Sequence, residues 1–243
     1  MKYMGSKRRI AKDILPIMLR ERGNRPWVEP FVGGGNIISE ASGERFGMDS
    51  NRYAIESLMS VKHFLHELPQ NNKEFTEDDY INLRKNDEYN HKGYAGFALS
   101  YGGKWLGGWR RSNGAYRDYV NESYRAAVIQ SKKLQGVVLV CGDYQNILIP
   151  EKSLIYCDPP YQGTTRYKYK FNSEIFFEWC RQQACKGHIV FVSEYKAPLD
   201  FCCVWEKEIS SSLTRNTGEK KGTEKLFMVS SLLGNGGVSN NDK

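Results

Sequence analysis

The sequence predicts an α/β fold built on a mostly parallel sheet, with a smaller lobe inserted into it. Three observations support this prediction. Short apolar runs alternate with helical patterns, as in strands joined by right-handed helical crossovers. Several of these runs end at an aspartate. A long segment that is poor in aliphatic residues and rich in glycine, aromatic residues and arginine interrupts the alternation.

The predicted strands are short apolar runs bounded by turn-forming or polar residues. Five of them have the composition of buried parallel strands, at residues 27–31, 45–48, 137–141, 153–157 and 188–192. Helical patterns occupy residues 37–42, 52–68 and 173–185. The last two runs, at residues 204–209 and 226–230, flank a charged turn region and predict an antiparallel hairpin.

The connection between the second and third strands is far longer than usual. Its centre, residues 96–119, is GFALSYGGKWLGGWRRSNGAYRDY. We expect residues 70–134 to form an inserted lobe, and residues 1–69 and 135–233 to form one domain around the sheet. The polar, glycine-rich tail at residues 234–243 is expected to be disordered.

The composition bounds the class of protein. A chain of 243 residues with 40% hydrophobic residues fits one domain with an insertion and a sizeable core. The net charge of +7 and a pI near 9.0 suggest a polyanionic partner. Fifteen tyrosines and five tryptophans offer faces on which nucleic-acid bases can stack.

The cysteine, histidine and hydropathy patterns disfavour several classes. The six cysteines form no CxxC pair, and only four histidines exist to complete a metal set. We therefore expect reduced thiols in an intracellular, cytoplasmic protein, with neither zinc nor disulfides. The first residues, MKYMGSKRRIAKD, lack the apolar core of a secretion signal, and no run approaches the length of a membrane span.

Three predicted strands end in a carboxylate, at Asp49, Asp143 and Asp158. Aspartate is a good N-cap for a following helix, which explains any one of them on structural grounds. In an open α/β sheet, however, the ligand crevice lies outside the carboxyl ends of the strands. Because the carboxylates recur together with a glycine-rich turn after the first strand, we interpret them as parts of a ligand site.

The glycine-rich turn, VEPFVGGGN at residues 28–36, allows the backbone to approach a ligand closely. The last glycine of the dinucleotide fingerprint GxGxxG is absent, and no GxxxxGK[ST] motif occurs. With Asp49 available for a ribose, a nucleoside cofactor without a pyrophosphate, such as S-adenosylmethionine, fits best. The N-terminal KYMGSK is either a solvated basic start or a cofactor contact, in which Tyr3 packs on the cofactor and Lys7 pairs with its carboxylate.

Taken in order, KYMGSK, EPFVGGG, the acidic strand end at Asp49 and DPPY resemble the Dam-like DNA adenine-N6 methyltransferases. The stretch YCDPPYQGTTRY, followed by a Phe/Trp-rich helix and GHIVFVSEY, is similar to the small phage and prophage members. The resemblance spans about residues 3–229, and four motifs in one order make it specific. It implies a Rossmann-like, seven-stranded methyltransferase sheet, S-adenosylmethionine as methyl donor, and double-stranded DNA as substrate, with no metal and no membrane.

The resemblance also implies roles for individual residues. Asp158, Pro159, Pro160 and Tyr161 would hold the adenine, and Asp158 would also border the cofactor. The residues that match the cofactor motifs are Tyr3, Lys7, Pro30, Phe31, Gly33, Gly35, Asp49, Asp143 and Tyr144. In the lobe, Arg110, Arg111 and Asn113 would fall in the DNA-contacting loop.

The DPPY stretch suits methyl transfer to an exocyclic amine. The N6 lone pair of adenine is delocalised into the ring, so the amine has to be reshaped and aligned. The Asp158 carboxylate and the Pro159 carbonyl can each accept one N6–H hydrogen bond, and the prolines keep both acceptors fixed. The adenine has to leave the stacked duplex, and a ring such as Tyr161 can stack on it, which is worth about 1–3 kcal/mol.

Two stretches interleave cations with aromatic residues and are expected to contact phosphate, because both flank the predicted pocket in sequence. The cations of the first, at residues 101–117, are Lys104, Arg110, Arg111 and Arg117, among Trp105, Trp109 and Tyr116. Those of the second, at residues 166–171, are Arg166, Lys168 and Lys170. The alternative is a solvated strand edge blunted by lysine. A third basic group, residues 215–225, contains Glu219 and Glu224 and has the pattern of a solvated turn.

Several alternatives stay open from the sequence. Cytosine-N4 methyltransferases usually carry serine in place of Asp158, and protein-glutamine methylases usually carry asparagine, so both are disfavoured. An RNA adenine-N6 methyltransferase and a catalytically idle DNA-binding protein with the same fold remain alternatives. A nicotinamide dehydrogenase is a more distant one. The sequence does not reveal the target site, its degree of specificity or the oligomeric state.

Overall fold

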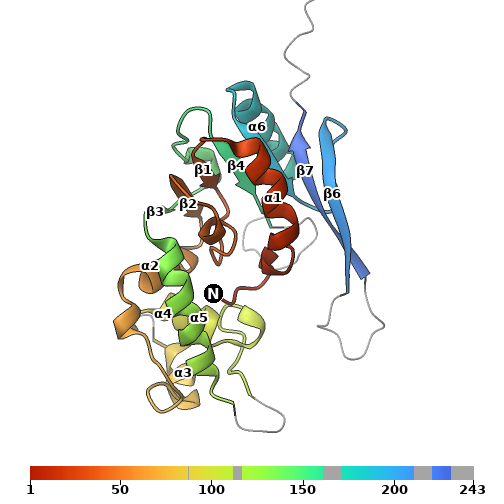
Figure 1. Cartoon of the computed structure of the whole chain (residues 1–243). Coiled ribbons are helices and arrows are strands. Elements are labelled where there is room, and N and C mark those ends of the chain that lie inside the picture. The colour runs from red at the N-terminus through yellow and green to blue at the C-terminus, as the bar shows by residue number, and fades with distance from the viewer. Residues whose placement is uncertain (87, 112–116, 161–170, 211–220, 231–243) are drawn as a thin grey trace, which may run out of the picture.

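One sheet of seven strands organises the fold (Figure 1). The computed structural model describes residues 1–86, 88–111, 117–160, 171–210 and 221–230. The strands are β1 (Trp27–Glu29), β2 (Arg45–Asp49), β3 (Val137–Cys141), β4 (Leu154–Cys157), β5 (Ile189–Ser193), β6 (Phe201–Ser210) and β7 (Lys221–Val229). Their order across the sheet is β3-β2-β1-β4-β5-β7-β6.

The first five strands are parallel to one another, and β7 is antiparallel to both of its neighbours. β1 pairs with β2 on one side and with β4 on the other. β7 pairs with β5, with Ser193 opposite Leu226, and with β6 at the edge of the sheet. The predicted mostly parallel sheet with an antiparallel C-terminal strand pair is confirmed.

The prediction of a buried strand is wrong for β3. Among the described strands, β3 pairs with β2 alone and forms one edge of the sheet. Val137 is buried, whereas Val138 and Val140 are each 47% exposed and Cys141 is exposed. The apolar run has the composition of a central strand, but its place at the edge of the sheet decides its burial.

Two of the predicted helices are confirmed in position. α6 (Ser173–Cys185) spans the predicted residues. α2 (Arg52–His63) covers the first part of its predicted range, and a 3-10 turn at Leu65–Glu67 follows it. The sequence patterns did not indicate α1 (Ala11–Arg22), which contains Pro16 within the helix.

The sequence predicted a helix at residues 37–42, directly after the glycine-rich turn. These residues are described, and they do not form a helix. In its place lies a single 3-10 turn, Ile38–Glu40. β2 begins at Arg45, and Gly43 between them has a φ of 69°. Too few residues therefore separate the glycine-rich turn from β2 for a full helix to form.

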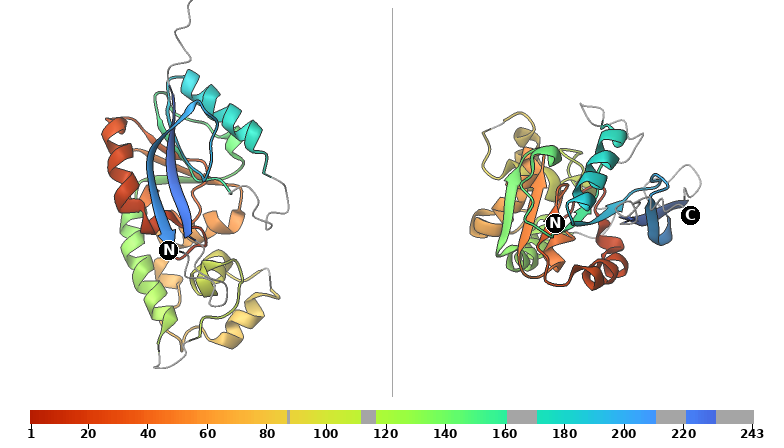
Figure 2. Two further views of the ribbon diagram at one scale, coloured as in Figure 1. Left: turned by 90° about the vertical axis from the view of Figure 1, so that its right-hand side faces the viewer. Right: turned by 90° about the horizontal axis from the view of Figure 1, so that it is seen from above.

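Side chains alternate between two cores, one on each face of the sheet. Trp27, Tyr156 and Phe191 belong to the first core, which α1, α2 and α5 (Tyr119–Leu134) cover. Val28 and Ile155 belong to the second core, which α6 covers. Because successive residues of a strand point to opposite faces, the sheet forms the middle layer of an α/β/α arrangement (Figure 2).

Short helices of the central segment lie below the sheet (Figure 1). They are α3 (Glu77–Leu83), α4 (Lys92–Ala98) and a 3-10 turn at Tyr101–Gly103. α4 approaches α2 so closely that a Cβ at Gly93 would lie 2.3 Å from the carbonyl oxygen of Tyr53. The division into a lobe at residues 70–134 and a domain at 1–69 and 135–233 stays a prediction.

We expect Gly93→Ala to destabilise the protein by about 1–3 kcal/mol, because the added methyl group would push α4 away from α2. Urea unfolding of the purified chain measures this change in the free energy of unfolding. Gly142→Ala is the matched control, since a Cβ there meets no atom of another residue closer than the Cε of Met48 at 3.4 Å. Equal stability of the two variants would contradict the close packing of α2 and α4.

Candidate active site

β1 and β4 are neighbouring parallel strands, so their carboxyl ends lie side by side. β1 and β4 are neighbours, and the sheet extends from them in opposite directions, to β2 and to β5. Such a switch point is where open α/β sheets form a ligand crevice. The glycine-rich turn follows β1, and Asp158 with its two prolines follows β4, so the two predicted motifs face the same crevice.

Asp49 ties the glycine-rich turn to the end of β2. Its Oδ2 accepts a hydrogen bond from the N–H of Gly33 at 2.9 Å, and its Oδ1 accepts one from the N–H of Asn51 at 2.9 Å. Burial raises the pKa of Asp49, and these two hydrogen bonds oppose the rise. At the end of β3, the N–H of Gly142 donates to the carbonyl oxygen of Asp49 at 3.0 Å. The ends of β1, β2 and β3 are therefore joined at this point.

Tyr3 lies against the glycine-rich turn. A Cβ at Gly33 would come within 2.9 Å of the Tyr3 ring, and one at Gly34 within 2.6 Å of the Tyr3 Cβ. The ring of Tyr3 also contacts Phe97 of α4, with 4.9 Å between the ring centroids. The glycines thus make room for a side chain of the same chain, in addition to the ligand approach inferred from the sequence. A third glycine, Gly35, has a φ of 64°.

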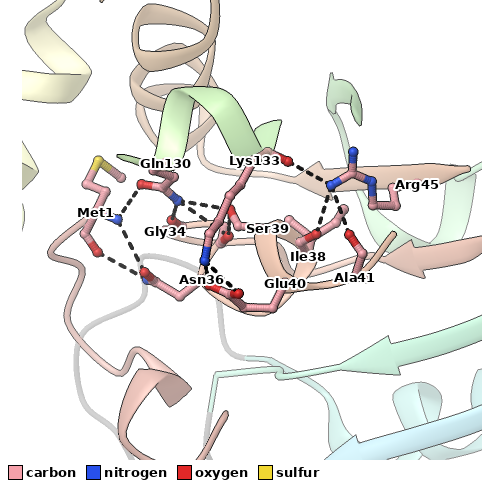
Figure 3. A network of polar contacts seen from close by, with 11 residues as sticks. Met1, Gly34, Asn36, Ile38, Ser39, Glu40, Ala41, Arg45, Gln130 and Lys133 are labelled. Atoms are coloured by element: carbon pink, nitrogen blue, oxygen red, sulfur yellow. Dashed lines mark hydrogen bonds and ion pairs between the residues drawn. The ribbon is translucent and has the colours of Figure 1, made fainter. Parts of the chain in front are cut away.

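Gln130 of α5 supports the other side of the glycine-rich turn (Figure 3). Its Nε2 donates to the carbonyl oxygen of Gly34 at 2.9 Å and to Ser39 Oγ at 3.3 Å. Its Oε1 accepts from the amino group of Met1, and Asn36 Nδ2 donates to the Met1 carbonyl oxygen at 3.1 Å. Gln130 is buried. The sequence did not reveal this residue, because a glutamine within an amphipathic helix carries no signal of a distant partner.

Asp143 and Tyr144 both follow β3, but their surroundings differ. Asp143 is exposed, and its Oδ1 accepts the N–H of Gln145 at 2.9 Å as the cap of the 3-10 turn Tyr144–Asn146. Tyr144 is buried, with its ring centroid 5.2 Å from that of Phe31. Burial raises the pKa of Tyr144 to about 12. Asp143 therefore acts as a cap, while Tyr144 and Phe31 form an aromatic pair beside the strand ends.

Asp158 contacts the N-terminal segment at the end of β4. Its Oδ1 lies 3.2 Å from the Nζ of Lys7, and the side chains of Asp158 and Lys7 are 22% and 6% exposed. Burial raises the pKa of Asp158 to about 6, and Lys7 opposes the rise. The sequence led us to expect Lys7 on the carboxylate of the cofactor. In the structure, its ammonium contacts Asp158.

Two glutamates complete this group. The sequence analysis did not single out Glu194, and its assignment of Glu224 to a solvated turn is wrong, because Glu224 lies in β7 and is 19% exposed. Glu224 of β7 places its Oε2 3.3 Å from the Nζ of Lys7. Glu194 follows β5 and is buried, and this burial raises its pKa to about 7. Its position directly after a strand was a usable signal. Glu224 had none, because its place depends on the antiparallel pairing of β7 with β5.

Three of the predicted DNA-contacting cations are exposed on the lobe. Lys104 is exposed. Arg111 is also exposed and forms an ion pair with Glu77. Arg117 is exposed and its Nη2 lies 2.7 Å from Glu122 Oε1. Ion pairs at exposed sites are worth little, so these guanidinium groups can exchange their partners for phosphate.

Arg110 and the tryptophans of the same stretch pack on aromatic rings of the chain itself. Arg110 is buried, and its guanidinium carbon lies 4.1 Å from the centre of the Tyr119 ring. Trp105 stacks on Tyr53 of α2 at 4.2 Å, and Trp109 contacts aromatic rings of the lobe. Trp105 and Trp109 are both half-buried, and their place on a DNA-facing surface stays a prediction.

Part of the predicted site lies outside the described residues. Pro30 and Pro159 are buried and Pro160 is half-buried. The predicted residues outside the described ranges are Tyr161, Asn113, Arg166, Lys168 and Lys170.

All six cysteines are free thiols. Within the described ranges, no three metal-ligating side chains gather into a possible ion site, and no helix has the length and apolar character to cross a bilayer.

The comparison with protein families decides the class of enzyme. The family model of the D12 class N6 adenine-specific DNA methyltransferases matches residues 3–215. The chain belongs to this family. It is therefore a DNA adenine-N6 methyltransferase that uses S-adenosylmethionine, as the order of its motifs led us to expect. The family assignment favours this activity over the RNA, idle and dehydrogenase alternatives.

Individual relatives were found by sequence and by structure. The type II methyltransferase M.MjaIII of Methanocaldococcus jannaschii is 28% identical over 218 residues, which cover 72% of this chain and 75% of that protein. Two solved structures, both provisionally assigned as methyltransferases, are more distant. The Escherichia coli protein yhhF has 9% identity and a TM-score of 0.41, over 91% of this chain and 86% of that one. SMU.472 in complex with SAH has 10% identity and a TM-score of 0.39, over 94% of this chain and 54% of that one.

The residues at the strand ends fit S-adenosylmethionine. Each carboxylate oxygen of Asp49 accepts one backbone N–H, which leaves a lone pair on each for the two hydroxyls of a ribose. The aromatic pair Phe31 and Tyr144 offers apolar surface beside it. The incomplete dinucleotide fingerprint agrees with a cofactor that has no pyrophosphate.

We expect Asp49→Ala to lower the affinity for S-adenosylmethionine at least about tenfold, which corresponds to about 1.4 kcal/mol. The variant loses the acceptors for the ribose and leaves the N–H of Gly33 without its partner. Isothermal titration calorimetry measures the dissociation constant. Asp78→Ala, which removes an exposed carboxylate of α3, is the control and should bind as the native chain does. An unchanged constant for Asp49→Ala would remove Asp49 from the cofactor site.

Proposed function

We propose that Asp158, Pro159, Pro160 and Tyr161 hold the target adenine of double-stranded DNA while its N6 is methylated. The position of Asp158 carries this assignment. It follows β4 next to the glycine-rich turn, and its Oδ1 contacts a buried ammonium, that of Lys7. A carboxylate held in this way, with a pKa near 6, is ionised at neutral pH and can accept a hydrogen bond from an amine.

We assign the cofactor to the edge formed by the ends of β1, β2 and β3. Asp49 would bind the ribose, and Phe31 and Tyr144 would line the apolar part of the site. The full set in this proposal is Tyr3, Pro30, Phe31, Gly33, Gly35, Asp49, Asp143 and Tyr144, with Asp158 at its border. Lys7, which the sequence associated with the cofactor, contacts Asp158 instead.

In the proposed mechanism, Asp158 and the carbonyl of Pro159 each accept one N6–H of the adenine. Two acceptors at fixed angles draw the nitrogen towards tetrahedral geometry and free its lone pair for attack. S-adenosylmethionine supplies a methyl group that its sulfonium already activates. As the nitrogen forms its bond to the methyl carbon, the bond from that carbon to sulfur would break and S-adenosylhomocysteine would leave. The nitrogen would then be cationic and have to lose one proton, which Asp158, as the acceptor of an N6–H, would take.

Tyr161 would stack on the adenine after it leaves the duplex. An enzyme that modifies a base has to extrude it, and this costs a few kcal/mol of stacking and pairing. Stacking on an aromatic ring returns about 1–3 kcal/mol. Tyr161 directly follows the two prolines in the sequence, which supports its assignment to the same pocket as Asp158.

The DNA-facing surface of this proposal combines the lobe, residues 70–134, with the stretch after the DPPY motif. Lys104, Arg111 and Arg117 are exposed cations of the lobe, and Asn113, Arg166, Lys168 and Lys170 are assigned from the sequence. Such contacts position the duplex without reading its bases. Arg110 is assigned to the lobe as well, where its buried guanidinium packs on the Tyr119 ring and its Nη2 lies 3.6 Å from Glu122 Oε2.

The biological setting is also a proposal. The sequence of YCDPPYQGTTRY and the helix after it resembles small phage and prophage methyltransferases, which supports an origin in a phage or prophage and action in the bacterial cytoplasm. Relaxed target specificity and a monomer or weak dimer are consistent with the short length of the predicted lobe.

Methylation of unmethylated duplex DNA with tritiated S-adenosylmethionine tests the function. After digestion to nucleosides, we expect the label in N6-methyladenine. Label in cytosine would overturn the base assignment. If the chain binds the cofactor but transfers no label to duplex DNA, single-stranded RNA is the next substrate to test, and the DNA activity would be rejected.

We expect Asp158→Asn to reduce single-turnover methylation by about 10²–10³-fold while leaving S-adenosylmethionine binding intact. The amide keeps the size of the side chain but loses the charge and one acceptor that the N6 amine needs. Single-turnover rates on duplex DNA and calorimetric cofactor binding separate the two effects. A rate close to that of the native chain would refute the role of Asp158.

We expect Lys104→Ala to weaken DNA binding on all sequences alike and to lower the slope of log K against log salt by about one, because one phosphate contact is lost. Lys186→Ala, which removes an exposed charge just after α6, is the control. Arg110→Ala should instead lower the thermal stability, since it removes a buried guanidinium from the Tyr119 ring. Equal salt slopes for Lys104→Ala and Lys186→Ala would place the DNA elsewhere.

A further inference from the structure

A buried ammonium joins two carboxylates that come from distant parts of the chain. The Nζ of Lys7 lies 3.2 Å from Asp158 Oδ1 and 3.3 Å from Glu224 Oε2. The side chains are 6% exposed for Lys7, 22% for Asp158 and 19% for Glu224. The N-terminal segment, the end of β4 and the start of β7 therefore meet at one charge.

The arrangement is electrostatically demanding. Burial by itself lowers the pKa of Lys7, but the two carboxylates outweigh it and the pKa is raised. For Asp158, burial raises the pKa, Lys7 lowers it and Glu224 raises it again. A second carboxylate on the same ammonium thus makes it harder to keep Asp158 ionised.

Other ionisable groups face the same cluster. Glu194 and Tyr195 follow β5, and the pKa values of both are raised, first by burial and also by the charge of Glu224. Tyr156 of β4 and Glu29 of β1 lie near Asp158, and burial raises the pKa of each. Lys7 is the cation that the shifts of Asp158 and Glu194 share. Its position therefore affects the charge of the whole group.

We propose that Glu224 is a positioning residue for methyl transfer, which acts on Asp158 through Lys7. This inference rests on the proposed function of Asp158. Glu224 holds the ammonium of Lys7 against Oδ1 of Asp158, so that Oδ2 is directed to the N6–H of the adenine. It also sets the pH at which Asp158 becomes an ionised acceptor, because it shares the ammonium with Asp158 and adds a like charge beside it.

The test is the pH dependence of kcat/KM on duplex DNA, whose acidic limb reports the ionisation of an essential base in the free enzyme. In Glu224→Gln, the like charge beside Asp158 disappears, so the acidic limb should move to lower pH by about one unit. In Lys7→Gln, the compensating cation disappears, so the limb should move to higher pH by a similar amount. Both variants should lose rate at their optimum, because Asp158 is less well oriented.

Glu206→Gln is the matched control. It removes the same charge from the neighbouring strand β6, where Glu206 is 60% exposed and pairs with Lys225. Its pH profile should coincide with that of the native chain. Circular dichroism and S-adenosylmethionine binding at each pH verify that the variants remain folded.

The outcomes separate this inference from the proposed function. Opposite shifts in Glu224→Gln and Lys7→Gln support it. A uniform loss of rate with an unmoved acidic limb would reduce Glu224 to a structural role and overturn the inference, while methylation by the native chain would keep the function. If Glu224→Gln does not fold, the direction of the shift in Lys7→Gln decides, since a limb that stays in place there also overturns the inference. Native chain that transfers no methyl group to DNA would overturn the proposed function itself.

Discussion

The candidate active site depends on the contact between Lys7 and Asp158. An ammonium that is 6% exposed has to be compensated by anions, and two strands of the C-terminal half of the chain supply them here. Asp158 follows β4, and Glu224 is near the beginning of β7. Because β7 is antiparallel to β5, its beginning, and not its end, lies at the carboxyl edge of the parallel strands. The reversal of one strand thus delivers a carboxylate to the site.

The N-terminal segment connects this charge to the cofactor side of the crevice. Tyr3 occupies the space that side chains at positions 33 and 34 would need, and four residues later Lys7 reaches Asp158. The glycine-rich turn also accepts a hydrogen bond from Gln130 of α5 and donates one to Asp49 of β2. The glycine-rich turn is therefore fixed on three sides by the protein. Preorganisation of this kind is what an enzyme needs when its catalysis consists mainly of orientation.

The sequence predicted the strands of the sheet and the aspartates at their carboxyl ends, because both depend on local patterns. Apolar runs mark the strands, and Asp49 and Asp158 fall at strand ends as predicted. The helix predicted after the glycine-rich turn is absent because β2 begins too soon after that turn. The exposure of β3 was not predictable, since it depends on the neighbours of β3 in space. Glu224 and Gln130 were missed for the same reason: their partners are 217 and 96 residues away in the chain, from Lys7 to Glu224 and from Gly34 to Gln130. Trp105 lies in a stretch that interleaves cations with aromatic residues, a pattern expected of a surface on which bases stack. In the structure, however, Trp105 stacks on Tyr53.

The most direct test of this account is the ionisation of Asp158 itself. Carbon-13 NMR of the side-chain carboxyl groups, with Asp158→Asn to assign the signal, gives its titration midpoint in the full chain. The account predicts a midpoint near pH 6, because burial opposes the charge and Lys7 only partly restores it. A midpoint near 4, the value of an aspartate in water, would mean that burial does not outweigh Lys7 at Asp158 and would contradict this prediction.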